Sequence, residues 1–576
     1  MTGSGAAGGT SGGSGGGAGG VGEPIRIRSF VRGGWVDGQG AGEALLNPAT
    51  EEVVATASTR GVDMGAALAH ARAAGGKLRA QGFAARARTL KGLAALLREH
   101  RDELLGIAMR NGGNTLADAK FDVDGAIGAL FFYGTLGATL GDGVVLTAGE
   151  GVVLGKKTPL WGQHVWTPLR GVAVLVNAYN FPAWGLAEKL ACAHLAGMPV
   201  LVKPATLTAL LAYRIAELFA AGGVLPDGSF SFLAGPAGDL LDHLEAQDVL
   251  AFTGSAATGW RMRTHPRVLD KGVRINVEAD SLNAAVLGPD AAPGSPTWEL
   301  FVREVVQEMT QKSGQKCTAT RRILVPQGRV GEAESALVAR LREVRVGDPF
   351  ASGVTMGPVV SAPQRRSVRE GIAALARHAR LVLGSGERVE RHDGGDPGVG
   401  FFVNPVLLRA DDGGGGAGGP VHSLEVFGPV ATLLPYGGTA TEAAALVALG
   451  DGSLVSSVYS DDPAFVREAL LEAASYNGRI TVGSAATAAE SWGPGAVHPA
   501  LLHGGPGRAG GGEELGGLPG AQRYMQRTAL QGARPLLEEV LRGAGSAGPA
   551  AAPPTAPAAP TAPAAAPAEG RPEGAS

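Results

Sequence analysis

The sequence has few cysteines and almost no excess of charge of one sign. Two cysteines, Cys192 and Cys317, occur in 576 residues, which excludes a disulfide framework and a cysteine-rich zinc site and fits a reducing compartment. The 50 basic and 53 acidic residues leave a formal net charge of −3. Bulk electrostatic attraction to nucleic acid or to an anionic membrane is therefore not expected.

Long apolar runs are also missing. No stretch is long enough to span a bilayer, and the first residues lack the basic and apolar regions of a secretory signal, so we expect a soluble cytoplasmic protein. Three histidines, His194, His243 and His503, do not have the spacing of metal ligands in the sequence, and no metal is predicted.

Length and composition predict two or three domains with a sizeable core, because 45% of the 576 residues are hydrophobic. Residues 1–22 are almost entirely Gly, Ser, Ala and Thr, and residues 543–576 are rich in Ala and Pro. Such segments bury too little apolar surface to offset their chain entropy. Both ends are predicted to be disordered.

Between the ends, apolar strands alternate with helical patterns, which predicts a parallel α/β sheet with right-handed crossovers. Ligands of such sheets bind beyond the carboxyl ends of the strands. Strands are predicted at 29–36, 171–176, 200–202, 230–233, 249–253 and 323–325. Helices are predicted at 64–74, 84–99, 102–111, 184–196, 207–221, 239–246, 332–344 and 441–448. A glycine-rich loop is predicted at 503–517.

Cys317 follows a predicted helix and precedes a short apolar strand. Val302, Val305, Val306 and Met309 have the spacing of one buried helical face, and the small residues after them predict a turn that presents the thiol. A thiol in such a loop is a candidate nucleophile, although a lone loop cysteine is more often structural.

The motifs around Cys317 occur in a characteristic order. They are Asn-Phe-Pro at 180–182, Lys-Pro at 203–204, Phe-x-Gly-Ser-x-x-x-Gly at 252–259, a lone Glu278, Gly-Gln-x-Cys at 314–317 and Glu-x-Phe-Gly-Pro at 425–429. This succession resembles that of the NAD(P)-dependent aldehyde dehydrogenases over about residues 24–542.

The resemblance implies an aldehyde dehydrogenase-like α/β fold with three parts. A Rossmann-type cofactor domain would comprise 24–143 and 168–282, and an α/β catalytic domain would comprise 283–517. Segments 144–167 and 518–542 would form a β-extension used in oligomerisation. Because the segment 528–530 resembles an edge strand that pairs across subunits, a homodimer or a larger even-numbered homo-oligomer is expected.

The resemblance also assigns the chemistry. Cys317 would attack the aldehyde as a thiolate, giving a thiohemiacetal that yields a hydride to the nicotinamide. The Asn180 amide and the Cys317 backbone N–H would stabilise the oxyanion. Glu278 would activate water against the resulting thioester, and burial at the end of an apolar strand is expected to raise its pKa. The simpler interpretations are a turn-forming Asn180 and an exposed strand-end Glu278. Asp280, where many relatives have glycine, is a weaker candidate for a residue that supports the catalytic groups.

Cofactor residues follow from the same motifs. By resemblance, Lys203 would bind the adenine ribose, and Ser255, after Gly254, would contact the pyrophosphate at a helix N-terminus. Gly259 would permit close approach of the cofactor. Glu425 would bind the nicotinamide ribose, and Phe427 would pack near the nicotinamide ring.

Thr206 bears on the choice of cofactor. Many NAD-preferring relatives have a glutamate here, whose carboxylate repels the 2′-phosphate of NADP, whereas a threonine can donate to that phosphate. NADP is therefore predicted to be used at least as well as NAD.

Four strings narrow the resemblance to one branch, namely SGQKCTATRR, VEADSLN, HGGPGRAGGGEELGGL and RYMQRTALQG. They resemble semialdehyde dehydrogenases that oxidise CoA-linked intermediates of aerobic phenylacetate and benzoate degradation, some of which are fused to a ring-hydrolysing hydratase. No hydratase fits the 543–576 tail, so a separate enoyl-CoA hydratase-type partner is possible. Arg321 and Arg322 could meet a CoA phosphate, but charge pairing around the thiol loop is favoured.

Three alternatives stay open. The enzyme could oxidise a simpler aldehyde or semialdehyde, because one sequence does not define pocket specificity. It could pass its acyl group to CoA, which Glu278 makes less favoured because it provides a hydrolytic base. The fold could also serve a non-catalytic binding protein, which the presence of Cys317, Asn180 and Glu278 disfavours.

Overall fold

A computed structural model describes residues 23–387, 389–416 and 418–546. The predicted disorder of 1–22 and of 547–576 lies outside these residues. The first four residues of the predicted tail are described, and two of them form β23 (Gly545–Ser546), which pairs with β6. The ordered chain therefore extends slightly beyond the predicted boundary. No described helix has both the length and the apolar character needed to cross a membrane.

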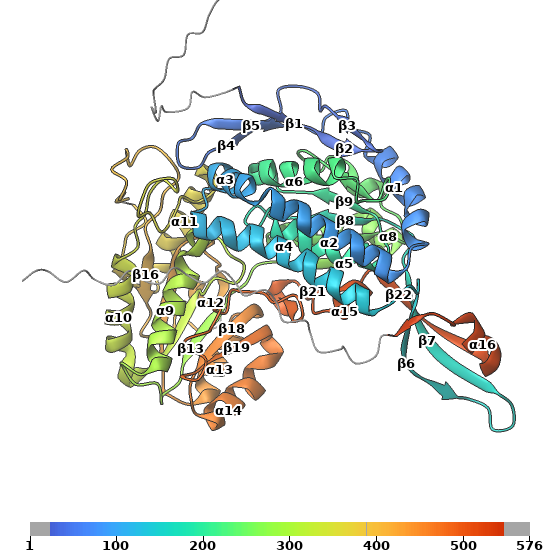
Figure 1. The fold of residues 1–576 in the computed structure, drawn as a ribbon. Coiled ribbons are helices and arrows are strands. Elements are labelled where there is room, and N and C mark those ends of the chain that lie inside the picture. The colour runs from blue at the N-terminus through green and yellow to red at the C-terminus, as the bar shows by residue number, and fades with distance from the viewer. Residues whose placement is uncertain (1–22, 388, 417, 547–576) are drawn as a thin grey trace, which may run out of the picture.

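Two seven-stranded sheets lie at the centre of the fold, and each has helices packed on it (Figure 1). The first sheet, from edge to edge, is β12 (Arg274–Glu278), β11 (Val249–Thr253), β8 (Ala173–Val176), β9 (Val200–Lys203), β10 (Phe230–Phe232), β2 (Ser29–Val31) and β3 (Gly34–Val36). Its strands β12 to β10 are parallel, as predicted. Its helices are α1 (Met64–Arg79), α2 (Phe83–Glu99), α3 (Arg101–Gly112), α4 (Leu116–Thr139), α5 (Trp184–Ala196), α6 (Ala209–Ala221), α7 (Ala256–Arg263) and α8 (Pro266–Lys271).

The second sheet carries the strand that follows Cys317. Its order is β15 (Arg380–Leu383), β16 (Val406–Arg409), β17 (Val430–Tyr436), β14 (Arg322–Pro326), β13 (Ala284–Leu287), β18 (Ser453–Tyr459) and β19 (Asn477–Gly483). Its helices are α9 (Pro296–Thr310), α10 (Val330–Arg342), α11 (Ala362–Leu375), α12 (Pro420–Ser423), α13 (Ala440–Ala448) and α14 (Pro463–Ala473). Strand β14 is central, so the segment that carries Cys317 leads into a fully paired part of the sheet.

Three smaller sheets complete the structure. One is β1 (Ile25–Ile27), β5 (Val53–Ala57) and β4 (Glu43–Leu46), and a second is β20 (Leu502–Gly505) with β21 (Gly512–Leu515). The third has the order β22 (Met525–Ala533), β7 (Leu160–Pro168), β6 (Leu146–Val153) and β23, and it projects from the body together with α16 (Arg534–Val540) (Figure 1). Short helix α15 (Leu518–Gln522) precedes β22. Strand β22 lies at the edge of its sheet, as predicted.

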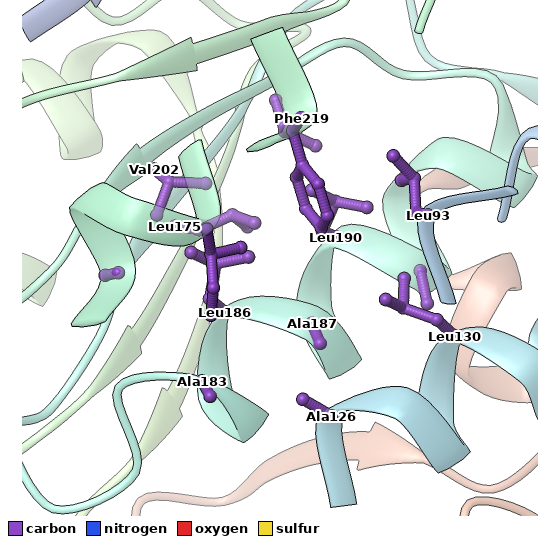
Figure 2. Close-up of a cluster of buried hydrophobic side chains, with 14 of the residues drawn as sticks. Leu93, Ala126, Leu130, Leu175, Ala183, Leu186, Ala187, Leu190, Val202 and Phe219 are labelled. Carbon is purple, nitrogen blue, oxygen red and sulfur yellow. The ribbon is translucent and has the colours of Figure 1, made fainter. Parts of the chain in front are cut away.

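The largest core lies where α2, α4 and α5 pack on the first sheet. Leu93, Leu130 and Leu190 from these three helices are completely buried and lie against one another (Figure 2). Helix α5 is buried around its whole circumference. Burial of each such leucine contributes about 2 kcal/mol of apolar transfer free energy. A charged side chain on α5 must therefore find its partner inside the protein.

Three predicted elements differ from the structure, and one long helix is absent from the prediction. Residues 29–36 form a hairpin, because Arg32 and Gly33 have left-handed φ angles of 57° and 77°. The segment predicted as a helix at 239–246 contains a single 3₁₀ turn, Leu240–His243. The glycine-rich 503–517 loop contains the β20–β21 pair. Helix α4 was not predicted. It begins at a capping box in which Thr115 and Asp118 each accept the other's backbone N–H.

Candidate active site

The thiol loop, residues 311–321, reverses direction immediately after α9. Lys312, Ser313 and Gly314 have left-handed φ angles of 53°, 56° and 68°. A Cβ on Gly314 would overlap the backbone carbonyl of Gly428, so this position requires glycine. Two consecutive non-glycine residues in this region are costly, and their conformation must be held by the surrounding structure.

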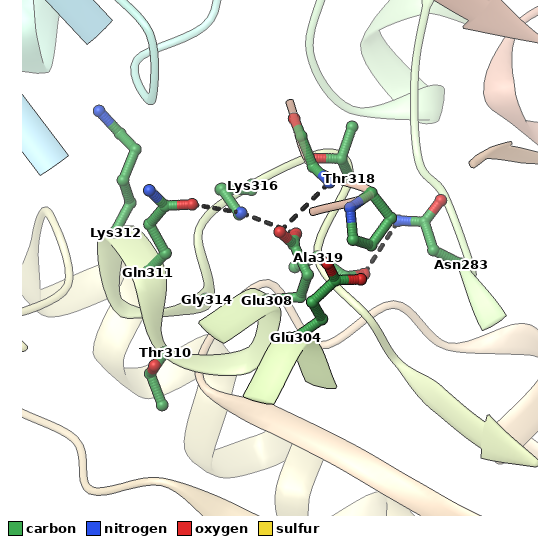
Figure 3. A network of polar contacts seen from close by, with 12 residues as sticks. Asn283, Glu304, Glu308, Thr310, Gln311, Lys312, Gly314, Lys316, Thr318 and Ala319 are labelled. Atoms are coloured by element: carbon green, nitrogen blue, oxygen red, sulfur yellow. Dashed lines mark hydrogen bonds and ion pairs between the residues drawn. The ribbon is translucent and has the colours of Figure 1, made fainter. Parts of the chain in front are cut away.

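Hydrogen bonds from side chains to backbone hold the thiol loop. The Asn283 amide donates to the carbonyls of Cys317 and Ala319 at 2.8 and 2.9 Å, a contact to the loop that Figure 3 shows. Arg321 donates to the carbonyls of Gly314 and Gly428 at 2.9 and 2.8 Å. Because each bond ends on a backbone atom, the loop's path is fixed and not merely its side chains.

Buried charged side chains also support the loop. Lys316 is completely buried, and its ammonium lies 2.7 Å from the Glu308 carboxylate of α9 and 2.7 Å from the Gln311 side-chain oxygen (Figure 3). Arg322 is also completely buried, and it donates to the carbonyls of Leu282 and Val447. The predicted charge pairing is seen for Arg321, which lies 3.7 Å from the Glu425 carboxylate. Arg322 instead bonds to backbone carbonyls and forms no ion pair with a described carboxylate. Both side chains are buried, which disfavours contact with a CoA phosphate.

Cys317, Glu278 and Asn180 line one cavity, which brings together the three predicted catalytic residues. Glu278 ends β12 of the first sheet, Asn180 lies in the loop after β8, and Cys317 comes from the second sheet. The cavity wall also includes the side chains of Phe121, Phe181, Trp184 and Val497. Apolar walls around a few polar groups are typical of a small-molecule site.

Glu278 differs from the prediction in its electrostatics. Burial raises its pKa, as expected, but the opposing charge and hydrogen bond of His503 outweigh burial, and Lys189 adds to them. The Nε2 atom of His503 lies 3.0 Å from the Glu278 carboxylate. The net pKa of Glu278 is well below its usual value, and that of His503 is raised by the carboxylate against its burial. The predicted upward shift is therefore wrong, and the resting base is an ionised member of a pair.

The Cys317 thiol is protonated in this resting arrangement. Burial, and then the charge and hydrogen bond of Glu278, raise its pKa well above the usual value. No described residue accepts a hydrogen bond from the Cys317 backbone N–H, so that donor is available inside the site. The attack on a substrate therefore requires a proton acceptor, and Glu278 is adjacent.

A second charged pair lies behind Glu278. The ammonium of Lys189, on α5, lies 3.2 Å from Glu188 and 2.9 Å from Glu514, and all three side chains are buried. Sequence reasoning missed Lys189, Glu514 and His503. A Glu-Lys pair inside the otherwise apolar run 184–196 was an available signal, because unpartnered charges are rarely buried. Nothing in the spacing of the chain linked His503 to Glu278.

Three of the predicted cofactor residues lie at or just after the carboxyl ends of the first sheet's strands. Lys203 ends β9, Thr206 begins the 3₁₀ turn that follows, and Ser255 is the N-cap of α7. Burial lowers the pKa of Lys203. The Asp280 carboxylate already accepts the Ala256 N–H at 2.9 Å, so an anion at this helix end would meet a negative charge as well as the helix dipole.

The two predicted cofactor-site glycines, Gly254 and Gly259, have packing roles. A Cβ on Gly259 would press on Val277, and one on Gly254 would press on the Phe252 ring. Gly259 therefore allows α7 to approach β12, a contact that the prediction of close cofactor approach did not include.

Glu425 and Phe427 lie beside the thiol loop. Burial raises the pKa of Glu425 to about 7 against the opposing effect of Arg321, which lies 3.7 Å away. One buried oxygen of Glu425 has no hydrogen-bond partner among the described residues. This oxygen is the one that faces Arg321, and because it accepts no hydrogen bond it fits a ligand that brings hydroxyl donors, such as a ribose. Phe427 packs edge-on against Tyr179, with ring centroids 6.0 Å apart.

Two α/β sheets that bring a buried thiol, a carboxylate and an amide to one cavity define a class of thiol-dependent oxidoreductases. The chain belongs to the aldehyde dehydrogenase family, whose model matches residues 35–529. It is 48% identical to 3,4-dehydroadipyl-CoA semialdehyde dehydrogenase from Aromatoleum evansii, over 84% of this chain and 93% of the relative.

Two further matches are informative. The chain is 41% identical to protein MaoC from Klebsiella aerogenes over 193 residues, which are 33% of this chain and 55% of the relative. Its fold matches that of betaine aldehyde dehydrogenase from Staphylococcus aureus in complex with NAD⁺, with a TM-score of 0.76 and 23% identity over 88% of this chain and 95% of that structure. The predicted family and fold are thereby confirmed.

Proposed function

We propose that this aldehyde dehydrogenase oxidises a CoA-linked semialdehyde from aerobic aromatic degradation to the carboxylic acid. The observation that carries the chemistry is the single cavity that joins Cys317, Glu278 and Asn180. The substrate class is supported by 48% identity to a dehydrogenase named for such a compound. The hydrolytic outcome follows from the base that stands beside the thiol.

The first step is addition of Cys317 to the aldehyde carbon. Because the resting thiol holds its proton and Glu278 is ionised, the proton passes to Glu278 as the C–S bond forms. The oxyanion that develops is stabilised by the Asn180 amide and by the free Cys317 N–H. The cofactor, when bound, would supply a nicotinamide ring that can accept the hydride, and Cys317 would then hold the acyl group as a thioester.

The second step is hydrolysis of the thioester. Glu278 first releases to solvent the proton that it took from the thiol, and it then takes a proton from water as the water attacks the acyl carbon. His503 holds the carboxylate in place at 3.0 Å. The C–S bond breaks, and the departing Cys317 thiolate takes the proton back from Glu278. A product released as free acid, not as acyl-CoA, is the expected outcome.

Binding of the cofactor is assigned to both sheets. Lys203 and Thr206 would hold the adenine ribose, and Glu425 would accept from the nicotinamide ribose hydroxyls through its orphaned oxygen. Ser255 would approach the pyrophosphate, and Phe427 would border the nicotinamide. Thr206 has no charge with which to oppose a 2′-phosphate, so we propose use of NADP as well as NAD.

The test compares substrates and products. A CoA-linked semialdehyde and free aliphatic and aromatic aldehydes are offered with NADP⁺ and NAD⁺, and the products are identified by mass spectrometry. The proposal expects a kcat/KM for the CoA-linked compound at least tenfold above that for the free aldehydes, with free acid as product. Equal values would point to a simpler aldehyde as substrate, and acyl-CoA as product would point to an acylating enzyme.

The proposed assembly is a homodimer or a larger even-numbered oligomer. Edge strand β22 is paired on one side by β7 along its whole length, from Met525–Pro168 to Ala533–Leu160. No described strand pairs with its other edge, so a second copy can add a strand there. Light scattering at micromolar concentration tests this, and a monomer would contradict it. A separate hydratase-type partner would supply the semialdehyde.

A further inference from the structure

The catalytic cavity contains a compact set of three different metal-ligand atoms. The sulfur of Cys317, a carboxylate oxygen of Glu278 and a ring nitrogen of His503 all lie within 4.8 Å of one another. They come from three separate segments of the chain, which only the fold brings together. A thiolate, an imidazole and a carboxylate are the donors that Zn²⁺ takes in proteins, with metal–ligand distances of about 2.0–2.3 Å.

The donor set suits a divalent cation. When Zn²⁺ binds, the Cys317 thiol would release its proton to solvent, and the thiolate and the Glu278 carboxylate would together balance the two charges of the ion. The imidazole of His503 would bind as a neutral ligand through one ring nitrogen.

The surroundings leave the ligand atoms free to bind. The Nδ1 atom of His503 has no hydrogen-bond partner among the described residues, so no neighbour fixes the proton on that nitrogen. Two cations lie nearby. The Lys189 ammonium is held by Glu188 and Glu514, and the Arg479 guanidinium donates to the Pro494 carbonyl at 2.7 Å, although one of its buried nitrogens has no hydrogen-bond partner among the described residues. Cys317 is half-buried and faces the cavity, which provides an entry path and space for water as the fourth ligand.

We propose that Cys317, Glu278 and His503 form a Zn²⁺ site, and that occupation of this site inhibits the enzyme reversibly. The ion would take the sulfur's lone pair and the base's oxygen together, so neither could act on an aldehyde. The inhibition rests on the catalytic roles proposed for Cys317 and Glu278, whereas binding of the metal does not.

Co²⁺ is the probe, because it takes zinc sites and its absorption reports thiolate ligation. The full chain, freed of metal by a chelator, is titrated with Co²⁺ in oxygen-free buffer. We expect one bound Co²⁺ per chain and a thiolate-to-cobalt charge-transfer band. Addition of Zn²⁺ should displace the Co²⁺ and abolish the band. The Cys317→Ser variant should lose the band, and His503→Gln should weaken binding by more than about tenfold.

Two matched controls separate this site from adventitious binding. His498→Gln changes a histidine of the same C-terminal region, which stacks on Trp492 and takes no part in the cluster. Cys192→Ala removes a fully buried thiol. Both variants should bind Co²⁺ as the unchanged chain does. Absence of the band, or a band that survives in Cys317→Ser or is unaffected by His503→Gln, would overturn the proposal.

The inhibitory part has its own measurement. Turnover should fall as Zn²⁺ is added, with an inhibition constant equal to the Zn²⁺ affinity found by displacement of Co²⁺, and a chelator should restore it. Specific Co²⁺ binding without inhibition would overturn the inhibitory role alone. If no aldehyde is oxidised at all, the cobalt spectra still decide whether the metal site exists, so the two failures are distinguishable.

Discussion

The thiol loop and the residues proposed to hold the cofactor differ in what holds their polar groups. Within the loop, Asn283, Arg321 and Lys316 donate to backbone carbonyls and to one carboxylate, although Arg321 Nε and Lys312 Nζ have no hydrogen-bond partner among the described residues. On the cofactor side, the buried Glu425 oxygen that faces Arg321 accepts no hydrogen bond. The path of the loop is therefore set by its own bonds before any ligand arrives, whereas Glu425 is completed by one. Substitutions in the two regions should have different signatures.

The largest expected effect is that of removing the nucleophile. Cys317→Ala should lower kcat by roughly 10⁴-fold or more, because no other described side chain in the cavity is a thiol. Binding of NADP⁺ should change little, since the thiol is not among the proposed cofactor contacts. Steady-state kinetics and calorimetric titration measure the two quantities. Turnover that persisted in this variant would contradict the proposed chemistry.

The second effect tests whether the loop depends on its backbone conformation. Gly314→Ala places a Cβ on the Gly428 carbonyl at a φ of 68°, so unfolding free energy should fall by more than about 2 kcal/mol and turnover should collapse. Gly331→Ala is the control. Its Cβ meets nothing within 4 Å on α10, and the change should be neutral or slightly stabilising. Denaturant melts compare them, and equal stabilities would refute the loop's dependence on glycine.

The third effect concerns the hydrogen bonds that fix the loop. Asn283→Ala leaves the Cys317 and Ala319 carbonyls without their donor, which should cost about 1–3 kcal/mol. We expect kcat to fall while KM for the cofactor stays within about twofold, because the change moves the thiol and not the ribose contacts. Asn404→Ala is the control, because it removes a half-buried amide that bonds to the Glu390 backbone and not to the thiol loop. A change confined to the cofactor KM would contradict the assignment.

The fourth effect reverses the pattern on the cofactor side. The folded-state pKa of Glu425 is about 7, above its ordinary value of 4.5, so the folded chain loses stability as pH rises between these values. Glu425→Gln removes this loss. Relative to the unchanged chain, the cofactor-free variant should therefore gain more stability at pH 8 than at pH 5, by up to about 3 kcal/mol. Cofactor binding should weaken at the same time.

Thermal melts at the two pH values measure the stability change, and fluorescence titration measures the binding. Glu299→Gln, which changes an exposed glutamate of α9, should alter neither. A Glu425→Gln variant that lost stability at pH 8 would show that the carboxylate serves the fold. Glu425 would then be a structural residue and not one that a ligand completes.

The sequence anticipated the regular elements more closely than the site's electrostatics. Helix 184–196 and strand 249–253 have the predicted bounds, because their apolar character is continuous. Helix α4 was missed because Asp118 and Asp122, which are buried in it, interrupt its apolar pattern. The motif order placed Cys317, Glu278 and Asn180 together, but motif order carries no information on charge. His503, which sets the state of Glu278, lies far along the chain and becomes a neighbour only in the fold.

The smallest expected effect refines the comparison at one proposed contact with the adenine ribose. Thr206 begins a short 3₁₀ turn after β9, and Thr206→Glu would place a carboxylate where a 2′-phosphate is expected, next to Lys203. The ratio of kcat/KM for NAD⁺ to that for NADP⁺ should rise about tenfold, equivalent to about 1.4 kcal/mol. Thr206→Gln has nearly the same size without the charge, so it should move the ratio much less.

If the two variants shift the ratio equally, bulk and not charge acts at this position. If neither shifts it, Thr206 does not contact the ribose, and discrimination must come from elsewhere on the first sheet. In either case the enzyme should keep its kcat with the preferred cofactor. The thiol loop lies on the second sheet and is held by its own hydrogen bonds.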